Sequence, residues 1–433
     1  MTPLAANLAR LSTDLRDAGA RVLAAGGAFA LWAFAIRVAA ALVAFVAQIA
    51  IARIVGEGEY GRVAAAVTVL GVAAALAVFG LDVAAQRFVA RYRQENDPPA
   101  LAGFLLFSRA LALAVGGAVG IVGALALAPH DPVLALAFAM LPAMALMMVQ
   151  EGIAKSFDWP ILALAPSYLL RPLLMLALVG AGLALGIGRG ATEVMLAMLV
   201  ATSLVCGVQA LMLRPRIAPM LPPGGARRIE GRHWLGVSVP LLVGDVGALV
   251  AVSADVIALA WFRSAEEAGI YFAAVKSLAL VPFVAYAISN AIAHRVSALH
   301  VRGDREALRA MVRRATLATL VPSVVFAAAL VALGPFVLGL FGPGFVEAWP
   351  AMAIVAAGTV ALAAVGPAER VLAMVGAERT YARIYVGAGV LACVLALALV
   401  PAYGVIGAAS ALALTMLAEA IALGLAVRRV LAR

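Results

Sequence analysis

Charged residues are scarce in this chain. Asp, Glu, Lys and Arg together make up 12% of its 433 residues, whereas a soluble domain has about 25%. Hydrophobic residues make up 65%, and the mean hydropathy is +1.08. A water-soluble fold could not cover so much apolar surface. The sequence therefore predicts an all-α polytopic membrane protein.

Residues that bind metals or carry covalent chemistry are also few. Both cysteines, Cys206 and Cys393, fall inside apolar runs, and the four histidines lie in predicted loops or at span ends. This pattern predicts neither a disulfide framework nor a metal site. The chain also lacks a phosphate-binding Gly-Lys-Ser/Thr loop, a His-Glu-x-x-His motif and a nucleophile elbow. We therefore expect no enzyme activity, no cofactor and no ATP hydrolysis.

Apolar runs recur along the whole chain instead. A helix needs about 20 apolar residues to cross a bilayer. On that rule the sequence predicts twelve transmembrane helices, at residues 29–54, 61–84, 100–127, 132–151, 160–186, 192–213, 234–262, 267–291, 315–341, 347–368, 380–400 and 403–427. The longest predicted connections are 85–99, 214–233 and 292–314.

Basic residues predict the orientation. If the N-terminus is cytoplasmic, 24 of the 32 Lys and Arg residues fall in cytoplasmic segments. Cytoplasmic segments of membrane proteins carry such an excess, so both termini are predicted to be cytoplasmic. Residues 1–25 alternate leucines with arginines at helical spacing, which predicts an amphipathic helix on the membrane surface. The net charge of +10 is thus a topology signal, and we expect no nucleic-acid partner.

The two halves of the chain resemble each other at a spacing of 208 residues. This shift places Glu59 on Glu267, Gly61 on Gly269 and Arg87 on Arg295 without a gap. Several matches at one offset predict a duplicated unit. We expect an N-terminal lobe at 26–213, a basic linker at 214–233 and a C-terminal lobe at 234–433. Because each unit has six spans, a pseudo-twofold axis along the membrane normal should relate them.

Four basic residues lie within predicted spans, and each would cost roughly 2.5–3.5 kcal/mol if it faced lipid. We therefore expect them to face protein or a hydrated cavity. Gln48 is eleven residues after Arg37, so the two side chains share a helix face. Asn290 and Lys276 are fourteen apart and also share a face. The candidate substrate-binding residues are Arg37, Gln48, Arg109, Arg171, Lys276 and Asn290.

Acidic residues within the spans are candidates for ion coupling, namely Asp245 and Glu419. The 208-residue shift places Arg37 on Asp245, so these two either form an ion pair between the lobes or line a hydrated cavity. Glu419 is equally compatible with packing and with function. Asp82 and Asp255 lie near span ends, where capping or snorkelling would account for them.

Several stretches resemble a known family. They are Ile51–Gly61 (IARIVGEGEYG), Phe79–Arg91 (FGLDVAAQRFVAR), Asp255–Leu259 (DVIAL), Ala268–Ala274 (AGIYFAA) and Leu340–Phe345 (LFGPGF). They are similar to segments of Wzx-type polysaccharide flippases, which belong to the multidrug/oligosaccharidyl-lipid/polysaccharide (MOP) exporter superfamily. The resemblance covers essentially the whole chain.

This resemblance implies a two-lobed, V-shaped transporter of the bacterial inner membrane that alternates between inward- and outward-open states. The implied cargo is an oligosaccharide linked to a polyprenyl pyrophosphate. Membrane lipids, polysaccharide polymerases and chain-length proteins are the implied partners. Lipid II flippases, a related branch, carry cationic residues on spans one and eight, which implies a cavity role for Arg37 and Lys276. That branch usually has fourteen spans, against twelve predicted here.

Other functions remain open at this point. A multidrug efflux pump of the same fold (MATE type) would need a cavity dominated by carboxylates and aromatic rings. A major-facilitator transporter also has six plus six spans, but its Gly-x-x-x-Asp-Arg-x-Gly pattern is missing after the second span. A membrane polymerase or ligase would need a large outer loop, and none is predicted.

Overall fold

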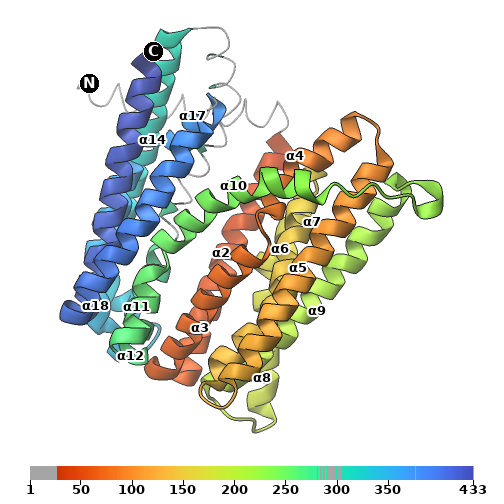
Figure 1. Ribbon diagram of the computed structural model, residues 1–433. Helices are drawn as coiled ribbons and strands as arrows, with labels where there is room; N and C mark the ends of the chain where they lie inside the picture. Colours follow the sequence, from red (N-terminus) through yellow and green to blue (C-terminus); the bar gives the residue numbers. More distant parts are fainter. Residues whose placement is uncertain are drawn as a thin grey trace.

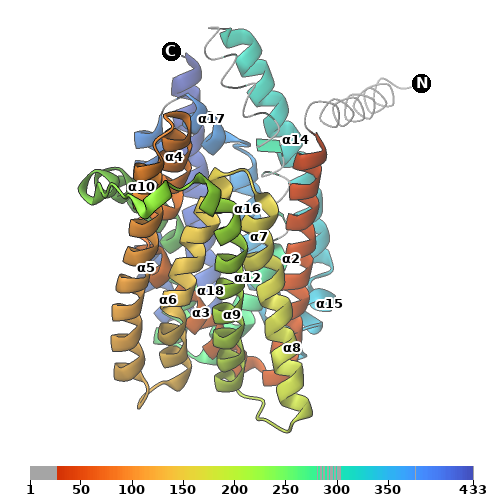
Figure 2. The same cartoon turned by 90° about the vertical axis from the view of Figure 1, so that its right-hand side faces the viewer.

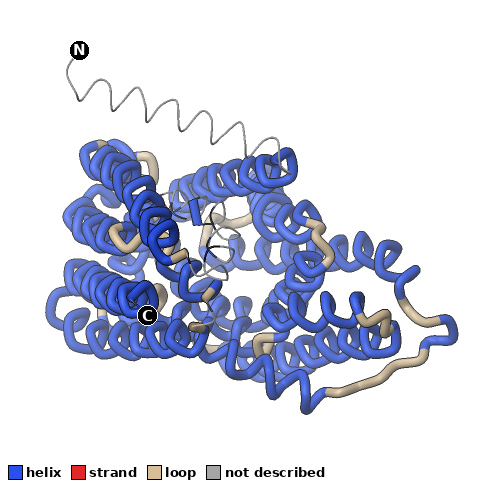
Figure 3. Tube along the Cα trace, turned by 90° about the horizontal axis from the view of Figure 1, so that it is seen from above, coloured by secondary structure: helices blue, strands red, loops and turns tan. Residues whose placement is uncertain are grey.

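The computed structural model describes residues 27–279, 304–375 and 377–432, together with residues 281, 282, 285, 288, 289, 292, 296 and 299. Within this part every regular element is a helix (Figure 3). The predicted all-α class is therefore confirmed. The predicted surface helix at 1–25 lies outside the described residues.

The N-terminal half contains ten helical elements in the described part. They are α2 (Gly27–Val55), α3 (Glu57–Ala77), α4 (Leu81–Gln94), α5 (Pro98–Leu127), α6 (Pro132–Ser156), α7 (Pro160–Ala165), the π-helix η1 (Pro166–Leu170), α8 (Arg171–Ala184), α9 (Ala191–Ile217) and the short 3-10 turn η2 (Ala218–Met220). A second 3-10 turn, η3 (Pro223–Gly225), lies in the predicted linker.

The C-terminal half contains α10 (Gly231–Ala251), α11 (Ala254–Phe262), α12 (Ala265–Leu278), α14 (Arg305–Ala332), α15 (Gly334–Gly339), the 3-10 helix η4 (Gly344–Ala348), α16 (Trp349–Ala363), α17 (Ala368–Met374) and α18 (Glu378–Ala432). α18 changes direction at Gly404, whose backbone is non-helical (φ 53°, ψ −129°), three residues after Pro401. The predicted boundary between the last two spans, 401–402, lies just before this kink.

Nine helices in the described residues are long and apolar enough to cross a membrane. Helix α18 counts once among them although Gly404 divides it, and the predicted span 267–291 falls partly outside the described residues. The chain is therefore a multi-pass membrane protein. The count of twelve spans and the cytoplasmic position of both termini stay predictions.

Some predicted boundaries were wrong. The segment 85–99 was expected to be a connection, but α4 stays helical through Gln94. The predicted span 61–84 is interrupted at Phe79 and Gly80, both of which have positive φ angles. Glycine adopts this conformation freely, whereas Phe79 adopts it at a cost. The span 160–186 contains the π-helix η1, and the span 234–262 breaks between α10 and α11.

Aspartate caps fix where two long helices begin. Asp97 accepts a hydrogen bond from the Ala100 amide, and Asp131 accepts from the amides of Val133 and Leu134. In both cases a proline occupies the first helical turn, where its missing N–H leaves no donor unsatisfied. The result is that α5 and α6 start at defined points and pair along their length.

The helices group into two lobes (Figures 1 and 2). Helices α2 and α4 to α9 pack mainly against one another, and α11 to α18 do the same, whereas α3 packs both on α6 and on α12. We call these groups the N-terminal and C-terminal lobes. In Figure 1 they diverge at the end that carries the C-terminus and converge at the other end.

Helix α10 connects the two lobes. Its first turn is fixed in the N-terminal lobe, because Trp234 is fully buried, its indole N–H donates to the Tyr92 hydroxyl at 2.9 Å, and its ring packs edge-on against Phe104. Further along, α10 packs on α18, where a Cβ on Gly247 would lie 2.7 Å from the Tyr385 carbonyl oxygen. Pro240 lies between these two attachments.

The linker before α10 is also held against the N-terminal lobe. The Arg228 amide donates to the Pro99 carbonyl at 2.9 Å, and its guanidinium binds the carboxylates of Asp97 at 2.6 Å and Glu230 at 2.8 Å. The hydrogen bond to Asp97 has the larger effect and that to Glu230 the next, and both raise the pKa of Arg228 above its ordinary value. The α9–α10 connection is therefore docked on the start of α5.

Candidate functional site

The two lobes meet where α3 crosses α12, at the end of the molecule away from the C-terminus (Figure 1). The backbones touch because both helices carry glycine there. A Cβ on Gly61 would lie 1.6 Å from the Ala265 carbonyl oxygen, and a Cβ on Gly269 would lie 2.4 Å from the Glu57 carbonyl oxygen. We call this contact the glycine seam.

The glycine seam is reciprocal. Gly61 and Gly269 are 208 residues apart, and so are Glu57 and Ala265. Gly61 contacts Ala265, and Gly269 contacts Glu57, which is the residue that corresponds to Ala265 in the first repeat. This exchange of equivalent contacts is expected across a twofold axis. The contact supports the internal repeat that the sequence indicated.

Aromatic rings close the same end of the molecule. Tyr60, which is 1% exposed, packs against Phe272 of α12 and against Phe341 and Phe345 of the C-terminal lobe, with ring centroids 5.7 to 6.3 Å apart. Its hydroxyl donates to Gln48 Oε1 at 2.8 Å. The predicted site residue Gln48 thus orients a ring that seals the lobe boundary.

Arg53 ties α2 to the opposite lobe at this end. Its Nε donates to the Leu340 carbonyl at 2.7 Å, and its Nη2 donates to the Gly339 carbonyl at 3.0 Å. These carbonyls belong to the end of α15, where a cation is favourable. One end of the lobe boundary is therefore closed by backbone contact, aromatic packing and an arginine.

The predicted cationic residues occupy different surroundings. Lys276 is exposed on α12, and its ammonium lies 4.7 Å from the centre of the Phe272 ring. Arg171 is partly buried on α8 and donates to the Met144 sulfur at 3.2 Å. Arg109 is partly buried on α5 and has no hydrogen bond or ion pair with the part of the chain that the structure describes.

Two of the predicted residues cannot be placed fully. Arg37 lies in α2, but its side chain is outside the described part of the structure, and Asn290 lies outside it altogether. Both alternatives for Arg37 and Asp245, an ion pair between the lobes or a hydrated cavity, therefore stay predictions. Within the described residues, the carboxylate of Asp82 in α4 lies close enough to Asp245 to repel it.

Asp255 does not snorkel to the membrane surface. It is 4% exposed and accepts hydrogen bonds from the Tyr271 hydroxyl and, at 2.8 Å, from the Val256 amide in the first turn of α11. The Lys276 ammonium lies within electrostatic range of the same carboxylate. Neither explanation that the sequence offered holds for this residue, because Asp255 is buried and lies inside α11, whose N-cap is Ser253.

The C-terminal lobe brings a group of carboxylates and tyrosines together. Tyr385 donates a hydrogen bond to Glu369, and Glu419 also acts on the charge of this group from nearby. The ring of Tyr381 lies 4.6 Å from that of Tyr385, and Asp245 acts electrostatically on Tyr381. Both predicted coupling residues thus act electrostatically on this tyrosine pair, and we call the group the tyrosine–carboxylate cluster.

The tyrosine–carboxylate cluster contains more hydrogen-bond acceptors than donors. A phenol has one proton to donate, so Tyr385 cannot donate to both glutamates at once. A further proton or a cation would reduce the repulsion between the two carboxylates. Sequence reasoning missed Glu369, which seemed to lie at a span end. The break at Gly366-Pro367 directly before it was the available signal, since discontinuous helices line transport sites.

No group of three or more His, Cys, Asp or Glu side chains in the described residues is arranged to hold a metal ion.

Residues 28–293 match the sequence profile of a family described as "Polysaccharide biosynthesis protein". The chain belongs to the polysaccharide biosynthesis protein family. The match covers more than half of the chain and includes both sides of the glycine seam. No curated protein matches this family member in sequence.

Solved structures share the fold. An inward-facing multidrug resistance MATE transporter of the MOP superfamily superimposes with a TM-score of 0.74 at 14% identity, covering 90% of this chain and 94% of that one. The lipid II flippase MurJ in an inward closed conformation gives 0.73 at 13% identity, with 92% and 87% covered. A MOP transporter from Pyrococcus furiosus gives 0.61 at 14% identity, with 96% and 95% covered.

These likenesses confirm the resemblance seen in the sequence. This member of the polysaccharide biosynthesis protein family has the fold of MOP transporters, and the solved structures that share this fold include MATE transporters and a lipid II flippase. The fold is more similar to the inward-facing MATE structure than to an outward-facing one, for which the TM-score is 0.63 at 15% identity and 93% and 95% coverage.

Proposed function

We propose that this protein flips an oligosaccharide linked to a polyprenyl pyrophosphate across the bacterial inner membrane by alternating access. The observation that carries the proposal is the glycine seam: symmetry-related helices close one end of the lobe boundary, while Lys276 of α12 and Asp245 of α10 stay exposed. The family match gives this transporter its place in polysaccharide biosynthesis.

In the proposed cycle the cargo enters between the lobes at the end where they diverge. Its pyrophosphate meets cationic side chains, for which Lys276 and the predicted Arg37 and Arg171 are the candidates. Arginine binds phosphate bidentately, and an ammonium neutralises it as a point charge. Gln48, Arg109 and Asn290 complete the proposed substrate-binding set. The polyprenyl tail stays in lipid while the glycan crosses between the lobes.

Release on the other side requires the glycine seam to part. We propose that protons or cations drive this step through the tyrosine–carboxylate cluster, because no nucleotide-binding motif is present in the chain. A proton that binds Glu369 or Glu419 gives the cluster a second hydrogen-bond donor besides the Tyr385 hydroxyl. Loss of that proton restores repulsion between the two carboxylates and changes how α17 packs on α18.

Purified protein in vesicles would test the flippase. A fluorescent polyprenyl-pyrophosphate oligosaccharide on the inner leaflet should become accessible to a membrane-impermeant quencher when the protein is present. Lys276→Gln should slow this transfer at least tenfold, whereas Lys276→Arg and the exposed linker variant Arg227→Gln should not. Transfer of the lipid at the protein-free rate would refute the proposal.

A MATE-type multidrug pump is the second candidate. The tyrosine–carboxylate cluster favours it, because acids and aromatic rings bind organic cations. Deletion separates the two functions. Accumulation of a polyprenyl-linked repeat unit on the cytoplasmic side indicates the flippase, whereas normal surface glycan with raised sensitivity to cationic dyes indicates the pump.

A further inference from the structure

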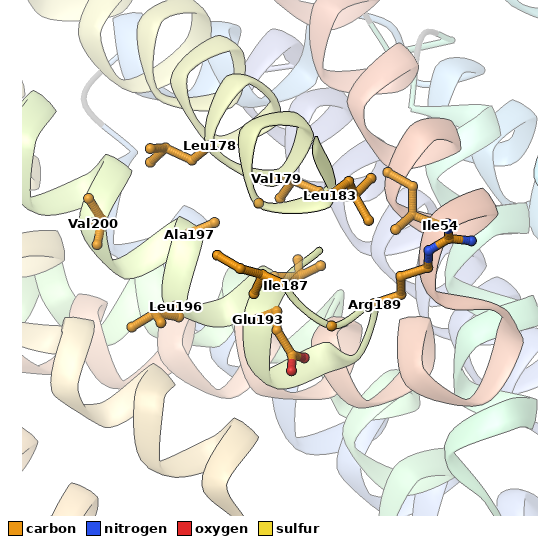
Figure 4. Close-up of a pocket in the computed structure, with 13 residues that line it drawn as sticks. Ile54, Leu178, Val179, Leu183, Ile187, Arg189, Glu193, Leu196, Ala197 and Val200 are labelled. Atoms are coloured by element: carbon orange, nitrogen blue, oxygen red, sulfur yellow. The ribbon is translucent and has the colours of Figure 1, made fainter. Parts of the chain in front are cut away.

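A pocket of about 190 Å³ opens between α2, α8 and α9 of the N-terminal lobe (Figure 4). It lies near the same end of the molecule as the glycine seam. Its wall is apolar over most of its length and includes Leu178, Leu183, Ile187, Leu196, Ala197 and Val200. Two charged residues, Arg189 and Glu193, are the exceptions.

The pocket faces the bilayer. Helices α8 and α9 are among those apolar enough to cross a membrane, and Ile187 and Leu196 are 52% and 51% exposed. Large apolar side chains exposed at this level contact hydrocarbon in a membrane. Water is a poor occupant of an apolar pocket because it finds no hydrogen-bond partners. A hydrocarbon chain fits the lining.

The charged end of the pocket is suited to an anion. Figure 4 shows Arg189 extended toward Ile54, with the Glu193 carboxylate apart from it. Glu193 accepts from the Gly190 amide at 3.0 Å and so helps to begin α9. Arg189 is exposed and makes no ion pair or hydrogen bond within the described part of the chain. Its guanidinium is therefore available to bind a phosphate bidentately.

We propose that this pocket binds one anionic phospholipid of the surrounding bilayer, with the phosphate on Arg189 and an acyl chain along the apolar wall. The ten residues of α9 from Ala191 to Val200 give the wall a length of about 14 Å, which spans most of one leaflet of hydrocarbon. A single guanidinium matches the single charge of a phosphodiester. The site is distinct from the proposed cargo path between the lobes.

The test measures retention of phosphatidylglycerol by the purified full-length protein in detergent, using native mass spectrometry. Diacylglycerol serves as the probe that lacks phosphate. Arg189→Gln should weaken phosphatidylglycerol binding about tenfold, the loss of one charge-assisted pair, and leave diacylglycerol unaffected. Gly182→Leu, which fills the pocket, should weaken both.

Two matched variants control for charge and for bulk. Arg227→Gln removes an exposed arginine from the linker, and Gly180→Leu adds the same side chain to α8 where a Cβ has no neighbour within 4 Å. Neither should change lipid retention. Equal binding by Arg189→Gln and the unchanged protein would overturn the proposal, as would a polyprenyl phosphate that displaces phosphatidylglycerol at equal concentration. Because retention is measured without transport, this result is independent of the flippase assay.

Discussion

Adding one methyl group to the glycine seam should prevent the lobes from closing at that end. In Gly61→Ala the new Cβ would lie 1.6 Å from the Ala265 carbonyl oxygen and 2.8 Å from the Gly269 nitrogen. Real contacts of this kind need about 3.5 Å, so α3 and α12 must separate by about 2 Å. Overpacking of this kind costs about 1–3 kcal/mol. We expect the population of the seam-closed state to fall roughly 5- to 150-fold.

Gly71→Ala is the matched control. It lies in the same helix, and a Cβ there would meet nothing within 4 Å. Both substitutions gain the same helix propensity, about 1 kcal/mol, so only the clash distinguishes them.

Spin labels at His130 and Phe336 would report the result, because these exposed positions lie on opposite lobes, near the end that carries the seam. Cys206 and Cys393 would first be replaced. Gly61→Ala should shift the distance distribution to longer values, and Gly71→Ala should leave it unchanged. If both variants give the distribution of the parent, the seam does not control closure and the reasoning is wrong.

Three further predictions concern the hydrogen-bonded residues. Trp234→Ala should destabilise the protein by about 3–5 kcal/mol in thermal unfolding, whereas Trp234→Phe should retain most of the stability; equal losses would contradict an anchoring role for the ring. Arg228→Gln should lower the melting temperature less than Trp234→Ala does, because the Asp97 pair is half-exposed and salt screens it; the difference from the parent should shrink at high salt. Tyr385→Phe should abolish gradient-driven transport without weakening cargo binding. Tyr403→Phe, which changes an exposed tyrosine of the same helix, is the control. Full activity of Tyr385→Phe would exclude its hydroxyl from coupling.

The sequence predicted the features that depend on composition and periodicity. Long apolar runs predicted the membrane helices, and the 208-residue offset predicted which residues correspond. The glycine seam follows from that correspondence, because Gly61 and Gly269 match in the sequence and touch in the structure. Residues that correspond in the two repeats come into contact when they lie on the twofold axis that relates the repeats.

The features that the sequence did not predict depend on how helices are placed against one another. The interruption at Phe79-Gly80 lies inside an apolar run whose composition does not change. Glu369 and Tyr385 are brought together by the packing of α17 on α18, and no residue near either one indicates the pairing. For the same reason the sequence treated Arg109 and Arg171 alike, although only Arg171 has a described hydrogen bond, to the Met144 sulfur.

Helix α10 limits how far the transporter can open. A helix of 21 residues is about 31 Å long, and its two ends belong to different rigid bodies. If the lobes separate further, α10 must therefore straighten or bend at Pro240, because its first turn is held by the buried Trp234 ring and its second half packs on α18. The length of α10 and the bend at Pro240 therefore set the width to which the two lobes can separate.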